Sequence, residues 1–171
     1  MEDKILKEIT DAVKGIEEKE YKLLTSTIKK AKRVFVAGKG RSGFVGRCFA
    51  IRLRHLGIEG YVTEETICPP IKKGDLLVAI SSSGNKKTIL GLIDKAKKSG
   101  AKVLAITSER NSPLKEISDY TILIDVGKSI QFGGSLFEQV SLIFLDIFVE
   151  KFRKYKGISH RDMARRHTNL E

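Results

Sequence analysis

The stretch Asp75-Leu-Leu-Val-Ala-Ile-Ser-Ser-Ser-Gly-Asn85 decides the fold class of this chain. Its first half is a short apolar run, typical of strands that are buried on both faces of a parallel sheet. Its second half places three hydroxyls and a glycine where that strand ends, and a helical pattern follows over residues 87–99. A strand, a polar loop and a helix in this order are typical of α/β proteins.

The same alternation of strand and helix patterns extends along all 171 residues. It predicts a three-layer αβα sandwich with a five-stranded parallel sheet, and five strands permit the flavodoxin-like order 2-1-3-4-5. The length fits a single domain, residues 1–171, in which helix 3–31 and the tail 157–171 are oligomer or active-site extensions. The expected strands are 33–38, 60–63, 75–80, 102–107 and 120–125, and the other helices are 42–56, 87–99, 112–117 and 134–152.

Helix 42–56 carries Phe44, Cys48, Ile51 and Leu56 on one side, and this side is the expected core face. The other cysteine, Cys68, precedes two prolines and is expected in a loop. Two cysteines twenty positions apart do not match a zinc motif, and a disulfide is not expected in a cytoplasmic protein.

The chain carries 32 basic and 21 acidic residues, and the difference of +11 indicates an anionic partner. Nucleic acid is a poor fit, because aromatic residues make up 7% of the chain, tryptophan is absent and no basic–aromatic stacking motif occurs. No run of 18 apolar residues is present, so no membrane span is expected. The first residues lack the apolar core of a signal peptide, and the expected location is the cytoplasm.

Two loops meet at the predicted switch point of the sheet, where the strand order reverses between the first and third strands. Open α/β sheets bind their ligands just beyond the carboxyl ends of the strands at this point. The two loops are Gly38-Lys-Gly-Arg-Ser-Gly43 and Ser81-Ser-Ser-Gly-Asn85, and each leads into a helix whose amino end attracts anions. Glycines allow the backbone to approach a ligand and serines donate hydrogen bonds, so the pair predicts a phosphate cradle. The candidate phosphate-binding residues are Gly40, Arg41, Ser42, Ser81, Ser82, Ser83, Gly84, Asn85, Lys86 and Thr88.

Two other interpretations of these loops remain open. Ser42 and Ser83 could be ordinary helix caps. Residues 38–43 also match G-x-G-x-x-G, and Glu64 or Glu65 could then bind a ribose, although the serine loop has no role in a dinucleotide site. No P-loop and no G-x-S-x-G motif occur in the chain.

Segments spread over almost the whole chain resemble the sugar isomerase (SIS) domain family and, within it, the 6-phospho-3-hexuloisomerases. The serine loop marks the wider family, and the Phe-Glu-Gln segment and the chain ending point to the hexuloisomerases. The matching segments are 38–43, 49–57, 74–84, 105–108, 112–114, 136–139 and 166–171.

This resemblance implies interconversion of D-arabino-hex-3-ulose 6-phosphate and D-fructose 6-phosphate, as in formaldehyde fixation by the ribulose monophosphate pathway. It also implies a homo-oligomer, either a tetramer or a dimer of dimers, and no cofactor. One departure concerns Lys86, because the family usually has a threonine there that helps to hold phosphate. Lysine could supply a charge instead, or Thr88 could compensate.

Moving a carbonyl between C3 and C2 requires a base, and the family's proposed base falls at Glu138. This carboxylate lies near the start of a helix that is otherwise apolar. Alternatively, Glu138 could be there only because the helix dipole stabilises an acidic residue in the first turn. His167 is the expected second acid–base group, either for ring opening or for polarising the carbonyl. Alternatively, His167 could have only a structural role in the packing of the tail. No carboxylate–histidine cluster has ligand spacing, so no metal is expected.

Other functions remain possible. The chemically nearest is isomerisation of another sugar phosphate, such as arabinose 5-phosphate. A sugar-phosphate-sensing module without turnover belongs to a different class, and such a module should lack the acid and the histidine or carry a DNA-binding domain. This sequence has both residues, and no helix-turn-helix is apparent.

Overall fold

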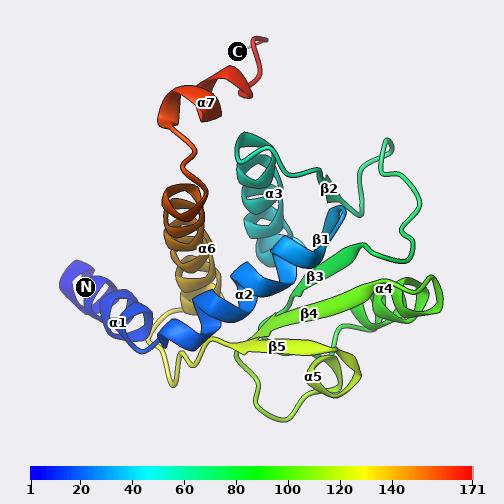
Figure 1. The fold of residues 1–171 in the computed structure, drawn as a ribbon. Helices are drawn as coiled ribbons and strands as arrows, with labels where there is room; N and C mark the ends of the chain where they lie inside the picture. Colours follow the sequence, from blue (N-terminus) through cyan, green and yellow to red (C-terminus); the bar gives the residue numbers. More distant parts are fainter. Residues whose placement is uncertain (171) are drawn as a thin grey trace.

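The five expected strands form a parallel sheet in the order β2-β1-β3-β4-β5, which confirms the predicted fold class and strand order (Figure 1). The structure is a computed structural model and describes residues 1–170. The strands are β1 (Val34–Gly38), β2 (Gly60–Val62), β3 (Leu76–Ile80), β4 (Lys102–Thr107) and β5 (Tyr120–Leu123).

Helices cover both faces of the sheet, as the fully apolar central strands require (Figure 1). Along β1, Val34 and Val36 contribute to the core on one face, and Phe35 and Ala37 to the core on the other. The first core is covered by α2, α3 and α6, and the second by α4 and α5. The helices are α1 (Glu2–Lys14), α2 (Glu18–Lys30), α3 (Gly40–His55), α4 (Lys87–Lys98), α5 (Pro113–Ile117), α6 (Ser135–Lys156) and α7 (His160–Arg165).

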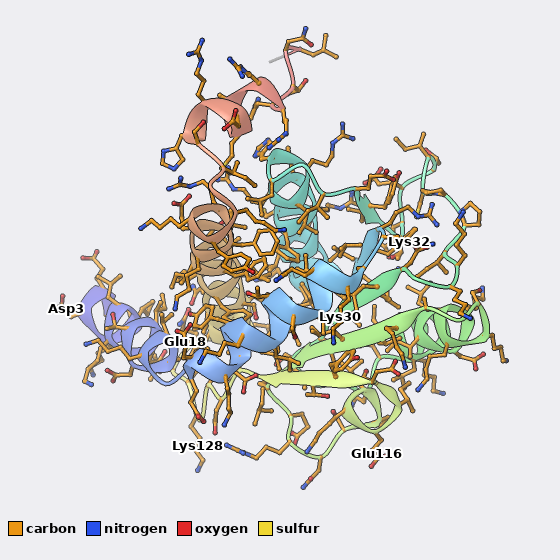
Figure 2. All side chains as sticks on the ribbon, in the orientation of Figure 1. Asp3, Glu18, Lys30, Lys32, Glu116 and Lys128 are labelled. Carbon is orange, nitrogen blue, oxygen red and sulfur yellow. The ribbon has the colours of Figure 1, made fainter. Side chains whose placement is uncertain are left out.

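The prediction of one helix over residues 3–31 is wrong, because the chain turns at residues 15–17 and forms α1 and α2. The break lets each helix place its own apolar side chains on the first core. In α1, Ile9 and Val13 pack there against α6 of the same chain. Glu18 lies at the start of α2 (Figure 2). It forms an ion pair with Lys151 of α6.

The predicted core face of α3 is also wrong for Phe44, Cys48 and Ile51. Phe44 is 68% exposed, Ile51 is 43% exposed and Cys48 is exposed. The helix rests on the sheet at Gly46, where a Cβ atom would lie only 2.9 Å from Cγ1 of Val36, so this close approach selects the face that is buried. The side chains buried on that face are Val45, Phe49, Leu53 and Leu56.

The segment after α6, expected as a basic tail, contains a further helix. Gly157, with φ +65°, ends α6, and α7 then begins with a capping box between Ser159 and Asp162. That Ser-x-x-acid pattern is the sequence signal that would have predicted this helix. Among residues 1–170, no helix is both long enough and apolar enough to cross a membrane.

Candidate functional site

The two glycine- and serine-containing loops lie side by side, because β1 and β3 are neighbours in the sheet. Gly38 pairs in register with Ile80, so both strands end at the same edge. The loops that follow them therefore leave the sheet together, as predicted for a switch point.

The first loop is folded tightly on itself at its glycines. A Cβ atom at Gly38 would lie 2.7 Å from the carbonyl oxygen of Ser42, and one at Gly43 would lie 2.9 Å from the carbonyl oxygen of Gly38. Gly40 starts α3 with φ +57°, a conformation that other residues rarely adopt. These glycines bring Ser42, which is buried, and Arg41 into the first turn of α3.

The serine loop is held by the end of β4. The carbonyl oxygen of Ser82 accepts hydrogen bonds from Oγ1 of Thr107 (2.9 Å) and Oγ of Ser108 (3.1 Å), and the hydroxyls of Ser82 and Ser108 are 2.9 Å apart. Gly84 has φ +60°, and a Cβ atom there would lie 2.5 Å from Oγ of Ser112. The loop therefore has a defined shape before any ligand binds.

Neither Ser42 nor Ser83 is a helix cap, so the ordinary structural explanation for these serines fails. α3 begins after Lys39 and α4 begins after Lys86, and neither start has a side-chain capping bond. Ser83 is exposed and donates to Oδ1 of Asn85 (2.8 Å). The hydroxyl of Ser81 accepts from the amide of Gly84 (3.3 Å) inside the loop.

Glu138 faces these loops from the first turn of α6. Its side chain is only 14% exposed and forms an ion pair with Nε of Arg41. A Cβ atom built on Gly134 would lie 3.7 Å from both Oε1 of Glu138 and Oγ of Ser82, so that small residue separates the two groups. The structure thus brings a carboxylate, a guanidinium and the serine loop together. Arg41 and Glu138 also line a pocket of about 300 Å³ between α3 and α6.

Most of the chain, including the residues of this site, matches a known protein family. The family model described as the SIS domain matches residues 27–149. The chain belongs to the SIS domain family.

Relatives of this SIS domain are similar along more than four fifths of their length. The 3-hexulose-6-phosphate isomerase of Methanocaldococcus jannaschii is 40% identical over 148 residues, which cover 86% of this chain and 82% of the relative. The enzyme of that name from Mycobacterium gastri is 35% identical over 172 residues, which cover 96% and 86%. A crystal structure from Methanococcus jannaschii, described as inferring a 3-hexulose-6-phosphate isomerase function, has a TM-score of 0.90, is 36% identical and covers 99% of this chain and 98% of that one.

The remaining predicted phosphate ligands of this SIS domain lie at the start of α4. Asn85, Lys86 and Thr88 are all exposed there, next to the serine loop. Of the two acids considered for a ribose, Glu64 pairs with Lys39 and Glu65 pairs with Arg47. Both are thus engaged with the protein, and this weakens the dinucleotide interpretation.

His167 does not join Glu138 within one chain. Its ring stacks on that of His55, the last residue of α3, with centroids 5.0 Å apart, and Nη1 of Arg166 donates to the carbonyl oxygen of His55 (2.9 Å). Fourteen residues of helix separate His55 from Arg41, a distance of about 21 Å at 1.5 Å per residue. Within a single SIS domain, His167 therefore lies far from the carboxylate it was predicted to assist.

Three residues that hold the serine loop of this SIS domain, and a fourth that lies beside it, were not predicted as site residues. They are Thr107 and Ser108 at the end of β4, Ser112 before α5, and Gly134 before α6. A signal was present, because Thr107-Ser108 continues the neighbouring strand of a parallel sheet and therefore reaches the same edge as Ser81–Ser83.

Proposed function

We propose that this protein is a 3-hexulose-6-phosphate isomerase that interconverts D-arabino-hex-3-ulose 6-phosphate and D-fructose 6-phosphate. The observation that carries the proposal is the Glu138 carboxylate, which is mostly buried and lies against Arg41 beside the serine loop. The names of relatives that match most of the chain support the same substrate. We assign the protein to the cytoplasm and to formaldehyde fixation by the ribulose monophosphate pathway.

Glu138 is the proposed base of the reaction. In the direction of fructose 6-phosphate, it removes the proton from C2 of the 3-ulose, and the electrons form a 2,3-enediol as the C3 carbonyl oxygen gains a proton. Return of a proton to C3 and loss of the proton on O2 give the C2 ketone. Arg41 forms an ion pair with the same carboxylate, and its guanidinium is the proposed group that stabilises negative charge on the enediol oxygens.

The serine loops are the proposed phosphate site. Ser42, Ser81 and Ser83 supply hydroxyl donors, while Gly40 and Gly84 let backbone amides approach. Arg41 and Lys86 add positive charge at the edge of the site, and Ser82, Asn85 and Thr88 complete the proposed set. Lys86, just before α4, supplies a positive charge where the family usually has a threonine hydroxyl.

Loss of a phosphate donor should weaken substrate binding. Ser42→Ala and Ser83→Ala should each raise KM by roughly 10- to 100-fold, since a hydrogen bond to a charged group contributes about 1.5–3 kcal/mol. Steady-state kinetics with the phosphorylated sugar would measure this, with Ser99→Ala at the opposite end of α4 as the control. Unchanged KM and kcat in both variants would refute the cradle.

The direct test of function is turnover of the 3-ulose 6-phosphate, followed as formation of fructose 6-phosphate. Arabinose 5-phosphate, offered at the same concentration, tests the nearest alternative substrate. Binding of both sugar phosphates without turnover of either would refute the isomerase proposal and favour a regulatory module.

We also propose a homo-oligomer, either a tetramer or a dimer of dimers, in which His167 acts at the site of a neighbouring subunit. A partner is needed because His167 and Glu138 lie at opposite ends of α3 in one chain. Phe44, Cys48 and Ile51 provide an exposed apolar stripe on α3, next to Leu142 of α6, that a second copy could cover.

Sedimentation should reveal an oligomer at micromolar concentration. Phe44→Lys should shift the protein to smaller species, because it places a charge in the apolar stripe of α3. Leu6→Lys tests the separate expectation that α1 contacts a partner, since Leu6 is 61% exposed. A wild-type protein that sediments as a monomer would contradict both expectations.

A further inference from the structure

The loop over residues 124–134 joins β5 to α6 and leads directly into the candidate site. It ends at Gly134, which lies between Ser82 and the carboxylate of Glu138. Ser135 then begins α6, and its amide and hydroxyl bond to the carbonyl oxygen of Phe132 (3.3 and 2.8 Å). The loop therefore contributes, together with the buried side chains of Leu136 and Phe137, to where the first turn of α6 presents Glu138.

Val126 packs against the first core where this loop leaves β5, but the two large apolar side chains farther along the loop are not buried. Ile130 is 56% exposed and Phe132 is 96% exposed. A loop whose large apolar residues face solvent gains little from hydrophobic contact, so its conformation depends on hydrogen bonds.

Those hydrogen bonds come from Glu8 of α1, which lies more than 120 residues earlier in the chain (Figure 1). One carboxylate oxygen accepts from the amide of Ile130 (2.8 Å), and the other from Oγ of Ser129 (2.9 Å) and Nε2 of Gln131 (3.3 Å). The amide of Gln131 also donates to Oγ of Ser129 (3.0 Å). Within residues 1–170, Glu8 is the one side chain from a distant segment that hydrogen-bonds to residues 126–134 of this loop.

We propose that Glu8 is a positioning residue for the isomerisation. By holding residues 129–131, it fixes the start of α6 and keeps the Glu138 carboxylate against Arg41 and the serine loop. This inference rests on the proposed function, in which Glu138 is the base. A carboxylate suits the task because three donors on consecutive residues converge on its two oxygens.

Glu8→Gln keeps the size of the side chain but replaces one acceptor oxygen with an NH₂ group that faces donors. We expect kcat to fall roughly 10- to 100-fold, the scale of a small misplacement of a reacting group, while KM stays within about twofold. Asp3→Asn is the control, because it removes the same charge toward the free end of α1, away from the loop (Figure 2). Ser129→Ala removes one donor and should cause a smaller fall in kcat.

Two results test the positioning role of Glu8. In the Glu138→Gln background, Glu8→Gln should cause no further loss of kcat, because both changes act on one step. The amides of Ile130 and Ser135, which both donate hydrogen bonds, should exchange with solvent at least about tenfold faster in Glu8→Gln, a result that needs no substrate. Unchanged exchange, a rise in KM alone, or a lower Tm with unchanged kcat would overturn the proposal.

The failure of this proposal can be distinguished from failure of the proposed function. A wild-type protein that does not turn over the 3-ulose 6-phosphate refutes the isomerase itself. An active wild-type protein whose Glu8→Gln variant keeps its kcat refutes only the positioning role.

Discussion

Glu138→Gln should lower kcat by roughly 10²–10⁴ while the fold stays intact, because the amide keeps the shape of the side chain and cannot accept the substrate proton. The same variant should abolish exchange of the substrate C–H proton with solvent. Both quantities can be measured together by following product formation in deuterated water.

A matched control lies on the same helix. Glu150→Gln removes an exposed carboxylate that is paired with Arg153, and it should leave kcat unchanged. His167→Ala should reduce turnover less than Glu138→Gln, and more from fructose 6-phosphate, whose ring must open. Near-normal proton exchange in Glu138→Gln would identify another residue as the base.

The second large effect concerns stability and lies at the opposite edge of the sheet. Asp75 is buried and accepts from Nε and Nη2 of Arg33 (3.1 and 2.6 Å) and from the amide of Lys72 (2.9 Å). Nη2 of Arg33 also donates to the carbonyl oxygen of Pro70 (3.0 Å). The pair therefore ties the start of β1 to the loop that enters β3.

Asp75→Asn should destabilise the protein by about 3 kcal/mol, because it leaves a mostly buried guanidinium without its countercharge. For a chain of this size, Tm should fall by roughly 6–12 °C. Asp94→Asn breaks an exposed pair with Lys98 and should change the free energy of unfolding by less than about 1 kcal/mol. Equal Tm values for the two variants would show that the buried pair of Arg33 and Asp75 stabilises the protein no more than an exposed pair does.

The same carboxylate gives stability a defined dependence on pH. Burial raises the pKa of Asp75, but hydrogen bonds from Arg33 and the Lys72 amide outweigh burial, so its pKa in the folded protein lies below the usual value. Its contribution is therefore complete above the unfolded value of about 3.9 and is lost as the pH falls through the lower folded pKa. Denaturant titrations of wild type and Asp75→Asn should converge as the pH approaches that lower value.

Much of the fold was predictable because its decisive signals are local. The run Leu76–Ile80 is apolar at every position, and only a strand covered on both faces uses such a run. The order of five alternating strands then placed residues 38–43 and 81–85 at one edge. The meeting of Arg41 with Ser82 and Glu138 follows from that topology and from the start of α6 at Ser135.

The parts that could not be predicted depend on contacts between distant segments. Helical periodicity predicts that α3 is amphipathic, but α3 has apolar side chains on two faces and periodicity does not show which face is buried. The close approach of Gly46 to Val36 determines that face. The stacking of His167 on His55 joins residues 112 positions apart, and no local pattern encodes it. The three bonds from Glu8 to residues 129–131 are of the same kind.

The attachment of the serine loop to β4 has a consequence for how binding activity arises as the chain is made. The groups that hold the carbonyl oxygen of Ser82 lie 25 and 26 residues later in the sequence, and Ser112 follows them. A growing chain therefore contains the full anion-binding motif well before it contains the scaffold that shapes it. Affinity for phosphate should arise in one step, when β4 docks beside β3, rather than build up gradually as the loop itself is synthesised.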